Sequence, residues 1–246
     1  MVGDDSQTLH NRLRDAGPEM LVGLVRDHLQ ELDPPALRQL FRNPHLSREA
    51  IELVLSERRL LTFQEVRKEL VKHRLTPEVQ ALRFVPGLFW RDLLEISGDN
   101  RIRPRLRRAA ERHLLERLPG MGAGEKAAIA RRAGPLLVAQ LRADSEPRVV
   151  SALLENPRLT EGALIPLVSS ETAKPEILAL VARNPKWGFR YPVRVSLARN
   201  RRTPVQTTLG LLPHLKKIDL KGIERDRRLP MPVRRRAAVL LGRSLG

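Results

Sequence analysis

The sequence predicts an all-helical protein built as a short right-handed stack of repeated helices. Apolar residues recur at helical spacing, as in Leu106, Ala110, Leu114 and Leu118, and no convincing run alternates like a strand. Of all residues 41% are hydrophobic but only 3% are aromatic. Burial must therefore come mainly from Leu, Val, Ile and Ala, which favours thin helix-on-helix layers over one large core.

A segment of 53 residues occurs twice in the chain. Residues 66–118 align with 193–245 at a constant offset of 127 without a gap, and 19 of the 53 pairs are identical. Thr76-Pro77 pairs with Thr203-Pro204 in this alignment. A match of this length at a fixed offset indicates duplicated supersecondary units, each of which buries the apolar face of its neighbour.

Short polar phrases punctuate the helical segments. Asn precedes Pro at Asn43, Asn156 and Asn184, and Asn200 precedes Thr203-Pro204. Asn readily ends a helix, and proline disfavours helix at the residue before it. The Ser or Thr that follows can cap the next helix, with Pro77 and Pro204 at the first helical position. Thr203 with Gln206 forms a capping-box pattern.

Each copy contains one shorter apolar segment, 93–96 in the first and 220–223 in the second. Asp92 and Asp219 directly precede these segments, and we interpret both residues as caps of a brief linking helix. The duplicated unit is therefore expected to contain three helices.

The phrase from Pro192 to Asn200, followed by Thr203-Pro204, resembles the leucine-rich-repeat-variant family, a relative of HEAT-like helical repeats. The phrase from Pro147 to Pro157 resembles it too. The resemblance implies an α-solenoid of HEAT-like or leucine-rich-repeat-variant repeats. The founding type of that family is associated with a cysteine-ligated iron–sulfur cluster, but this chain contains no cysteine. We therefore expect no cofactor.

A composition break marks the middle of the chain. Three glycines lie within five residues, from Gly120 to Gly124, and favour a flexible joint. We expect an N-terminal helical lobe at 1–119, the joint at 120–124 and a C-terminal lobe at 125–246. The alternative is one continuous solenoid that crosses the break.

The chain is strongly basic, with 45 Lys and Arg against 28 Asp and Glu and a formal net charge of +17. Such a charge attracts nucleic acid, anionic lipid or an acidic protein surface without choosing among them. The alternative is that arginine-rich usage reflects base composition alone. The first fifteen residues are charged and lack a long apolar run, so we expect a cytoplasmic protein without membrane insertion.

The residues that carry chemistry in enzymes are scattered. The six histidines lack the paired spacing that places two imidazoles on one helix face, and the glycines at 120–124 follow no predicted strand. No serine lies in a nucleophile-elbow context. We therefore expect neither a metal site nor catalysis.

The arginines are better organised. Arg101, Arg105, Arg108 and Arg112 follow steps of four, three and four, which places them along one stripe of a helix that begins near Pro104. The stripe is a candidate binding surface. The alternative is a solvated face whose arginines pair with the nearby acidic residues. Two of its positions recur in the second copy as Arg228 and Arg235, and Arg201 belongs to a further arginine cluster at a helix end. These three arginines are candidate binding residues as well.

Trp187, Phe189 and Tyr191 form the most distinctive local feature of this aromatic-poor chain. One interpretation is a loop that plugs the edge of the stack. The other is a recognition platform for a base or a partner side chain.

These patterns predict a non-enzymatic helical-repeat scaffold that binds an acidic protein partner. The alternative partner is nucleic acid, bound by the repeated arginines with the three aromatic residues as a stacking surface. A more remote alternative is a DNA glycosylase on a HEAT-like scaffold, which needs a carboxylate beside an aromatic pocket at Trp187.

Overall fold

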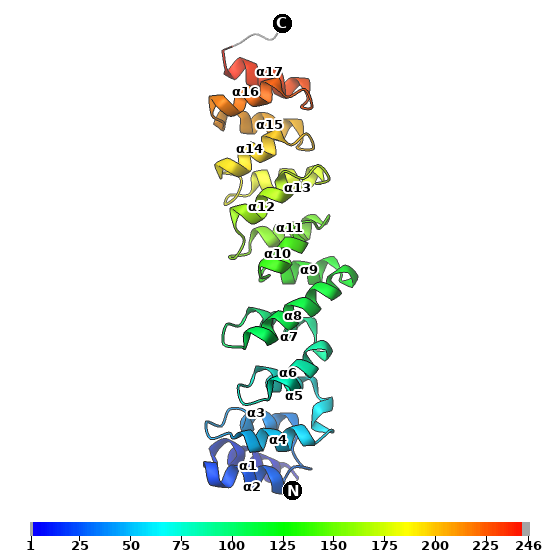
Figure 1. Ribbon diagram of the computed structural model, residues 1–246, viewed down its shortest axis with the longest axis vertical. Helices are drawn as coiled ribbons and strands as arrows, with labels where there is room; N and C mark the ends of the chain where they lie inside the picture. The colour runs from blue at the N-terminus through cyan, green and yellow to red at the C-terminus, as the bar shows by residue number, and fades with distance from the viewer. Residues whose placement is uncertain (1, 243–246) are drawn as a thin grey trace. The chain divides into compact units, whose positions relative to one another are not determined.

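The computed structural model describes residues 2–242, with side chains from Leu9 onward, and in this range it contains helices and turns but no strand (Figure 1). The all-α prediction is confirmed. The chain divides into two compact units, Met1–Glu116 and Arg117–Gly246. Each unit is described by itself below.

The first unit is a series of helices linked by short turns. Proline occupies the first helical position at Pro18, Pro34 and Pro104, where its missing N–H has no partner to lose. Its α-helices are α1 (Val2–Asp15), α2 (Pro18–Asp27), α3 (Pro34–Leu40), α4 (Arg48–Ser56), α5 (Gln64–Lys72), α6 (Glu78–Phe84), α7 (Trp90–Gly98) and α8 (Pro104–Arg117); the 3-10 turns are η1 (Leu60–Thr62) and η2 (Val85–Gly87).

The second unit continues the same kind of element. Its α-helices are α9 (Ala123–Ala130), α10 (Pro135–Leu141), α11 (Pro147–Leu154), α12 (Glu161–Val168), α13 (Pro175–Arg183), α14 (Tyr191–Arg199), α15 (Val205–Leu211), α16 (Lys217–Arg225) and α17 (Met231–Leu240); the 3-10 turns are η3 (Leu118–Gly120) and η4 (Leu212–His214).

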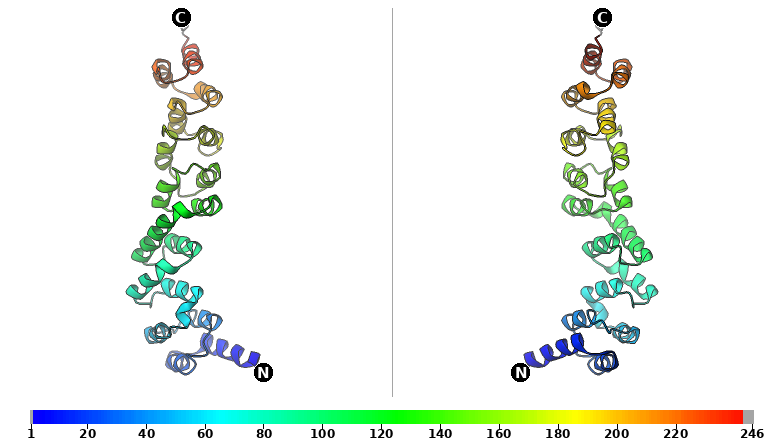
Figure 2. Two further views of the ribbon diagram at one scale, coloured as in Figure 1. Left: turned by 90° about the vertical axis from the view of Figure 1, so that its right-hand side faces the viewer. Right: turned by 90° about the vertical axis from the view of Figure 1, so that its left-hand side faces the viewer.

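Alternate helices pack against one another, so each unit is a stack of two layers. In the first unit α1, α3 and α5 form one layer, and α2 packs on α4. In the second unit α9, α11 and α13 form one layer, and α12, α14 and α16 form the other. Figure 2 shows the two rows of helices within each unit. This packing of local helical pairs is the arrangement expected of an α-solenoid.

The turns share one hydrogen-bond pattern. An asparagine at or just after the end of a helix accepts the backbone N–H two positions later, as Asn43, Asn156 and Asn200 do at 2.7–2.9 Å. The same three amides donate to two backbone carbonyls at the end of the helix two places earlier. Each Asn thus satisfies carbonyls that a helix end leaves unpaired. The prediction that Asn ends a helix is correct for Asn200, the C-cap of α14, whereas Asn43 and Asn156 lie in the turn just beyond the caps of α3 and α11.

The predicted caps are partly correct. Ser47 and Thr160 accept the N–H three residues later and cap α4 and α12. The Thr203–Gln206 capping box is wrong: the buried Thr203 hydroxyl donates to the Leu197 carbonyl, and Pro204 is the N-cap of α15. Pro77 is likewise the N-cap of α6, so the prediction that Pro77 and Pro204 occupy the first helical position is wrong by one residue.

The duplication is longer than the sequence identities indicate. Each of the helices α12 to α17 begins 127 residues after its counterpart among α3 to α8. The copy at 66–118 contains the end of α5 with α6, α7 and α8, so the predicted unit of three helices is wrong. The expected linking helices are full helices, α7 and α16, and Asp92 and Asp219 lie inside their first turns. Residues 243–245 of the second copy lie outside the described range.

The glycine segment at 120–124 is folded. Gly120 ends the 3-10 turn η3, and Gly124 lies in α9. Gly122 is the N-cap of α9, and its N–H donates to the Glu125 carboxylate at 3.1 Å. The segment therefore starts a helix, and its flexibility stays a prediction.

Candidate functional site

The positive charge of the chain is concentrated in the second unit. The first unit contains 20 Lys and Arg against 18 Asp and Glu, a net charge of +2. The second contains 25 against 10, a net charge of +15. The positive charge of the chain therefore comes mainly from residues 117–246.

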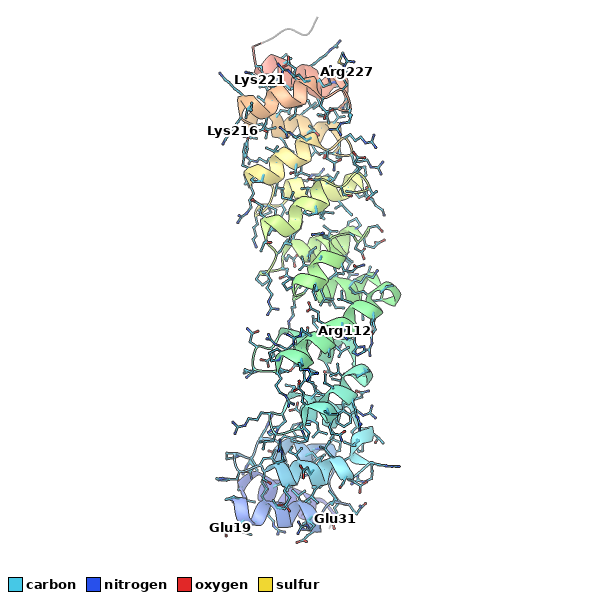
Figure 3. All side chains as sticks on the ribbon, viewed as in Figure 1. Glu19, Glu31, Arg112, Lys216, Lys221 and Arg227 are labelled. Carbon is cyan, nitrogen blue, oxygen red and sulfur yellow. The ribbon has the colours of Figure 1, made fainter. Side chains whose placement is uncertain are left out.

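Three of the four arginines of the predicted stripe lie on α8, which begins at Pro104 as expected, but Arg101 lies in the turn before the helix. Arg105, Arg108 and Arg112 are exposed on this helix, and Figure 3 labels Arg112. Arg105 lies 3.7 Å from Glu78. Neither Arg108 nor Arg112 has an ion pair within the described residues. These two side chains are free to meet a partner.

Arg101 and Arg228 occupy identical turns in the two copies. Each donates its backbone N–H and its guanidinium to the carboxylate two residues earlier, Asp99 or Asp226, at 2.8–3.0 Å. The side-chain hydrogen bond from Arg101, with its backbone N–H, lowers the pKa of Asp99 to about 2. Both arginines therefore help to fold a turn, as the solvated-face alternative proposed. Arg201 is exposed and 3.5 Å from Glu171.

Trp187 is a core residue, 1% exposed. Its indole N–H donates to the Leu154 carbonyl at 2.9 Å. Trp187 corresponds to the buried Leu60 in the 127-residue alignment, so the loop-plug interpretation describes it and the platform interpretation does not. The glycosylase alternative loses its aromatic pocket for the same reason. The following Gly188 has no room for a side chain, because an added Cβ would lie 2.1 Å from the Ala182 carbonyl oxygen.

The other two aromatic residues differ from each other. Tyr191 is tied to α16: its hydroxyl donates to Asp219 and accepts the Lys216 N–H at 2.9 Å. Phe189 is 71% exposed, with the Arg194 guanidinium 5.1 Å from its ring centre. Of the three aromatic side chains proposed for stacking, Phe189 is thus the exposed one.

A group of exposed cations on α16, on α17 and in the turn between them forms what we call the C-terminal cationic surface. Figure 3 shows Lys221 and Arg227 projecting from this part of the second unit. None of its residues has an ion pair within the part of the chain that the structure describes. Of the candidate site residues predicted from the sequence, this surface contains Arg235. The excess of Lys and Arg over Asp and Glu in residues 117–246 is the sequence signal that points to its other members. Its members are Lys217, Lys221, Arg225, Arg227, Arg235 and Arg236.

The first copy lacks this surface. Five of the six equivalent positions are uncharged there, and Arg108, the counterpart of Arg235, is the exception. Exposed apolar side chains lie among the cations of the second copy: Ile218 is 71% exposed, Val239 59% and Met231 47%. The surface therefore combines positive charge with apolar area.

Within the described residues, no group of three or more His, Cys, Asp or Glu residues lies close enough together to hold a metal ion. No helix in that range is long and apolar enough to cross a membrane.

No family model matches the chain, and no curated protein or solved structure matches it significantly. The description of the fold as a stack of repeated helices therefore depends on the helical packing and the internal repeat.

Proposed function

We propose that this chain is a non-enzymatic helical-repeat scaffold whose second unit binds an acidic partner protein. The observation that carries the proposal is the net charge of +15 on residues 117–246, against +2 on the first unit. Short helical stacks offer extended surfaces for partners. We assign the repeats to the leucine-rich-repeat-variant or HEAT-like style, which the Asn-terminated helices and the internal duplication support.

The chemistry of the C-terminal cationic surface favours a protein partner over nucleic acid. Ile218, Met231 and Val239 expose apolar area between the cations, which suits an amphipathic acidic segment. Base stacking, in contrast, uses exposed aromatic faces, and of the three candidate aromatic residues Phe189 alone offers one. Trp187 is buried, and the Tyr191 hydroxyl is engaged by Asp219.

Capture from native extract, divided into an untreated and a nuclease-treated sample, tests the proposal. The full chain is compared with a triple variant of the cationic surface, Lys221→Glu, Arg227→Glu and Arg235→Glu. The control reverses three exposed arginines of the first unit, Arg48, Arg58 and Arg83, to Glu. These variants carry the same change in net charge.

We expect an acidic protein to be recovered with the wild type and the control but lost with the cationic-surface variant. Reconstitution with the purified partner should give the same order of affinities. Recovery of nucleic acid with no stable protein partner would refute the proposal.

Nucleic acid is the second candidate, and the unpaired Arg108 and Arg112 on α8 favour it. An arginine that binds phosphate releases counterions, so the affinity for a random duplex should fall steeply with salt. Replacing Arg105, Arg108 and Arg235 together with Gln should reduce the slope of log K against log salt by roughly 0.9 per lost phosphate contact. Absence of duplex and single-strand binding at low salt would exclude this candidate.

A further inference from the structure

A cavity of about 300 Å³ lies within the second unit, along α14 and the turns that follow α12, α14 and α16. We call it the arginine pocket. Three guanidinium groups and one carboxylate line it, together with hydroxyl groups. The lining residues used here are Arg199, Arg201, Arg228, Glu171, Ser169 and Ser196.

The counterparts of two pocket-lining residues form a network of ion pairs in the first copy. Lys72, the counterpart of Arg199, contacts Glu95 at 2.8 Å. Lys68, at the position of the pocket-lining Val195, contacts Glu95 at 2.7 Å and Asp92 at 2.9 Å. A glutamate carboxylate thus lies between two ammonium groups.

The second copy lacks this carboxylate because Gly222 replaces Glu95. A Cβ added at Gly222 would lie 3.2 Å from the Arg199 Nη2, so a side chain there would extend along the guanidinium. Val195 likewise replaces Lys68. The second copy therefore keeps a cation in the pocket and leaves out the acid that satisfies its counterpart.

The arginines of the pocket have N–H groups to spare. Arg199 contacts Asp219 at 2.9 Å through one Nη, and Arg228 holds Asp226 through Nε and Nη2. A guanidinium has five N–H donors, so these contacts leave others for a ligand. Glu171, the acid within the pocket, lies 3.5 Å from the exposed Arg201 and also interacts electrostatically with Arg228.

We propose that the arginine pocket binds a carboxylate side chain of an acidic partner segment, which would contact Arg199 as Glu95 contacts its counterpart Lys72 in the first copy. Arginine suits this task because its planar fork matches a carboxylate. The inference rests on the proposed function, since it names the chemical group by which the second unit would recognise its partner.

The decisive variant is Gly222→Glu, which restores the carboxylate of the first copy and places it beside Arg199, one of the arginines that line the pocket. The atom that an added Cβ meets is the end of the flexible Arg199 side chain, which can move. The matched control is Gly210→Glu on α15, where nothing lies within 4 Å of an added Cβ. Both variants replace a helical glycine and add one negative charge to the same unit.

Binding is measured by fluorescence anisotropy with the full chain and a labelled hexaglutamate peptide at fixed ionic strength. We expect Gly222→Glu to weaken binding about tenfold and Gly210→Glu to weaken it less than about threefold, because loss of one charge-assisted contact is on the order of a tenfold effect. Arg201→Gln, an exposed substitution, should also weaken binding. It keeps the test valid if Gly222→Glu fails to fold, as judged by circular dichroism.

Other results would overturn the inference. Equal weakening by the two glutamate variants would mean that only net charge matters. Loss of peptide binding in the cationic-surface variant with full retention in Gly222→Glu would leave the proposed function intact and refute the pocket. Tenfold tighter binding of a matched phosphoserine peptide, abolished by Gly222→Glu, would assign the pocket to phosphate instead. No peptide binding by the wild type would contradict both proposals.

Discussion

The copy that ends in α8 and the copy that ends in α17 share their turns but differ in how they satisfy charge. Asp99–Arg101 and Asp226–Arg228 have the same hydrogen bonds to within 0.1 Å. In the first copy, lysine and glutamate side chains of α5 and α7 neutralise one another. The second copy replaces Glu95 with Gly222 and adds exposed cations on α16 and α17. The comparison teaches that the turns maintain the fold, whereas the helix faces were free to change.

The largest expected effect concerns the loop that carries Trp187. Gly188→Ala places a Cβ 2.1 Å from the Ala182 carbonyl oxygen, a backbone atom that cannot move alone. We expect a loss of about 3 kcal/mol in the free energy of unfolding, since overpacking of this kind distorts the backbone. Urea denaturation measures it. Gly210→Ala, in open space, should instead stabilise by up to about 1 kcal/mol.

The second prediction compares equivalent helix ends. The Asn200 side chain donates to the carbonyls of Val168 and Ser170, both at 2.8 Å. Its counterpart His73 accepts the Leu75 N–H at 3.3 Å. Asn200→Ala leaves buried carbonyls unsatisfied and should cost about 2 kcal/mol. His73→Ala should cost less in the same denaturation experiment. Equal costs would show that the Asn bonds contribute little.

The third prediction breaks the charge network of the first copy. Glu95→Ala removes the acid shared by Lys68 and Lys72 and should destabilise the protein by about 1 kcal/mol. The control is Glu65→Ala, which removes the exposed ion pair with Arg38 and should cost less than about 0.5 kcal/mol. Thermal melts at low and high salt check both values. A smaller loss for Glu95→Ala than for Glu65→Ala would contradict the network.

The smallest predicted effect is a pH dependence confined to the first copy. Burial, with a further contribution from the charge of Arg74, lowers the pKa of His73 below its ordinary 6.5. The unfolded chain then binds the proton more readily, so the stability that neutral His73 contributes is present above pH 6.5 and is lost as the pH falls through its folded pKa. His73→Asn, which copies the second unit, should flatten the melting temperature against pH in that window. An unchanged profile would disprove the assignment.

Much of the fold could be predicted from residue patterns because the turns that end the helices depend on residues close together in the sequence. The side chains of three asparagines accept the backbone N–H two residues later in the turn at or after a helix end, and the Asn-containing phrases are visible in the sequence. These residues are Asn43, Asn156 and Asn200. The number of helices in a copy was not predictable in the same way. The 3-10 turn at Val85–Gly87 separates α6 from α7, and the apolar spacing alone made α7 look shorter than it is.

The candidate site was less accessible to sequence reasoning, since burial and pairing depend on neighbouring helices. Trp187 stood out by its rarity, yet its partner is the Leu154 carbonyl, 33 residues away. The arginine pocket likewise depends on a contact between helices. Glu95, the counterpart of Gly222, is on α7, and its partners Lys68 and Lys72 are on α5. Spacing within one helix could not indicate either relationship.

The asparagine turns also bear on how the chain is made. The bonds from Asn43 to Ala16, from Asn156 to Ala130 and from Asn200 to Val168 span 26 to 32 residues. A growing polypeptide can close such short loops without waiting for a distant segment, and topologies dominated by local contacts fold quickly. Each new helix can therefore dock on its predecessor during synthesis, so the order of translation becomes the order of assembly.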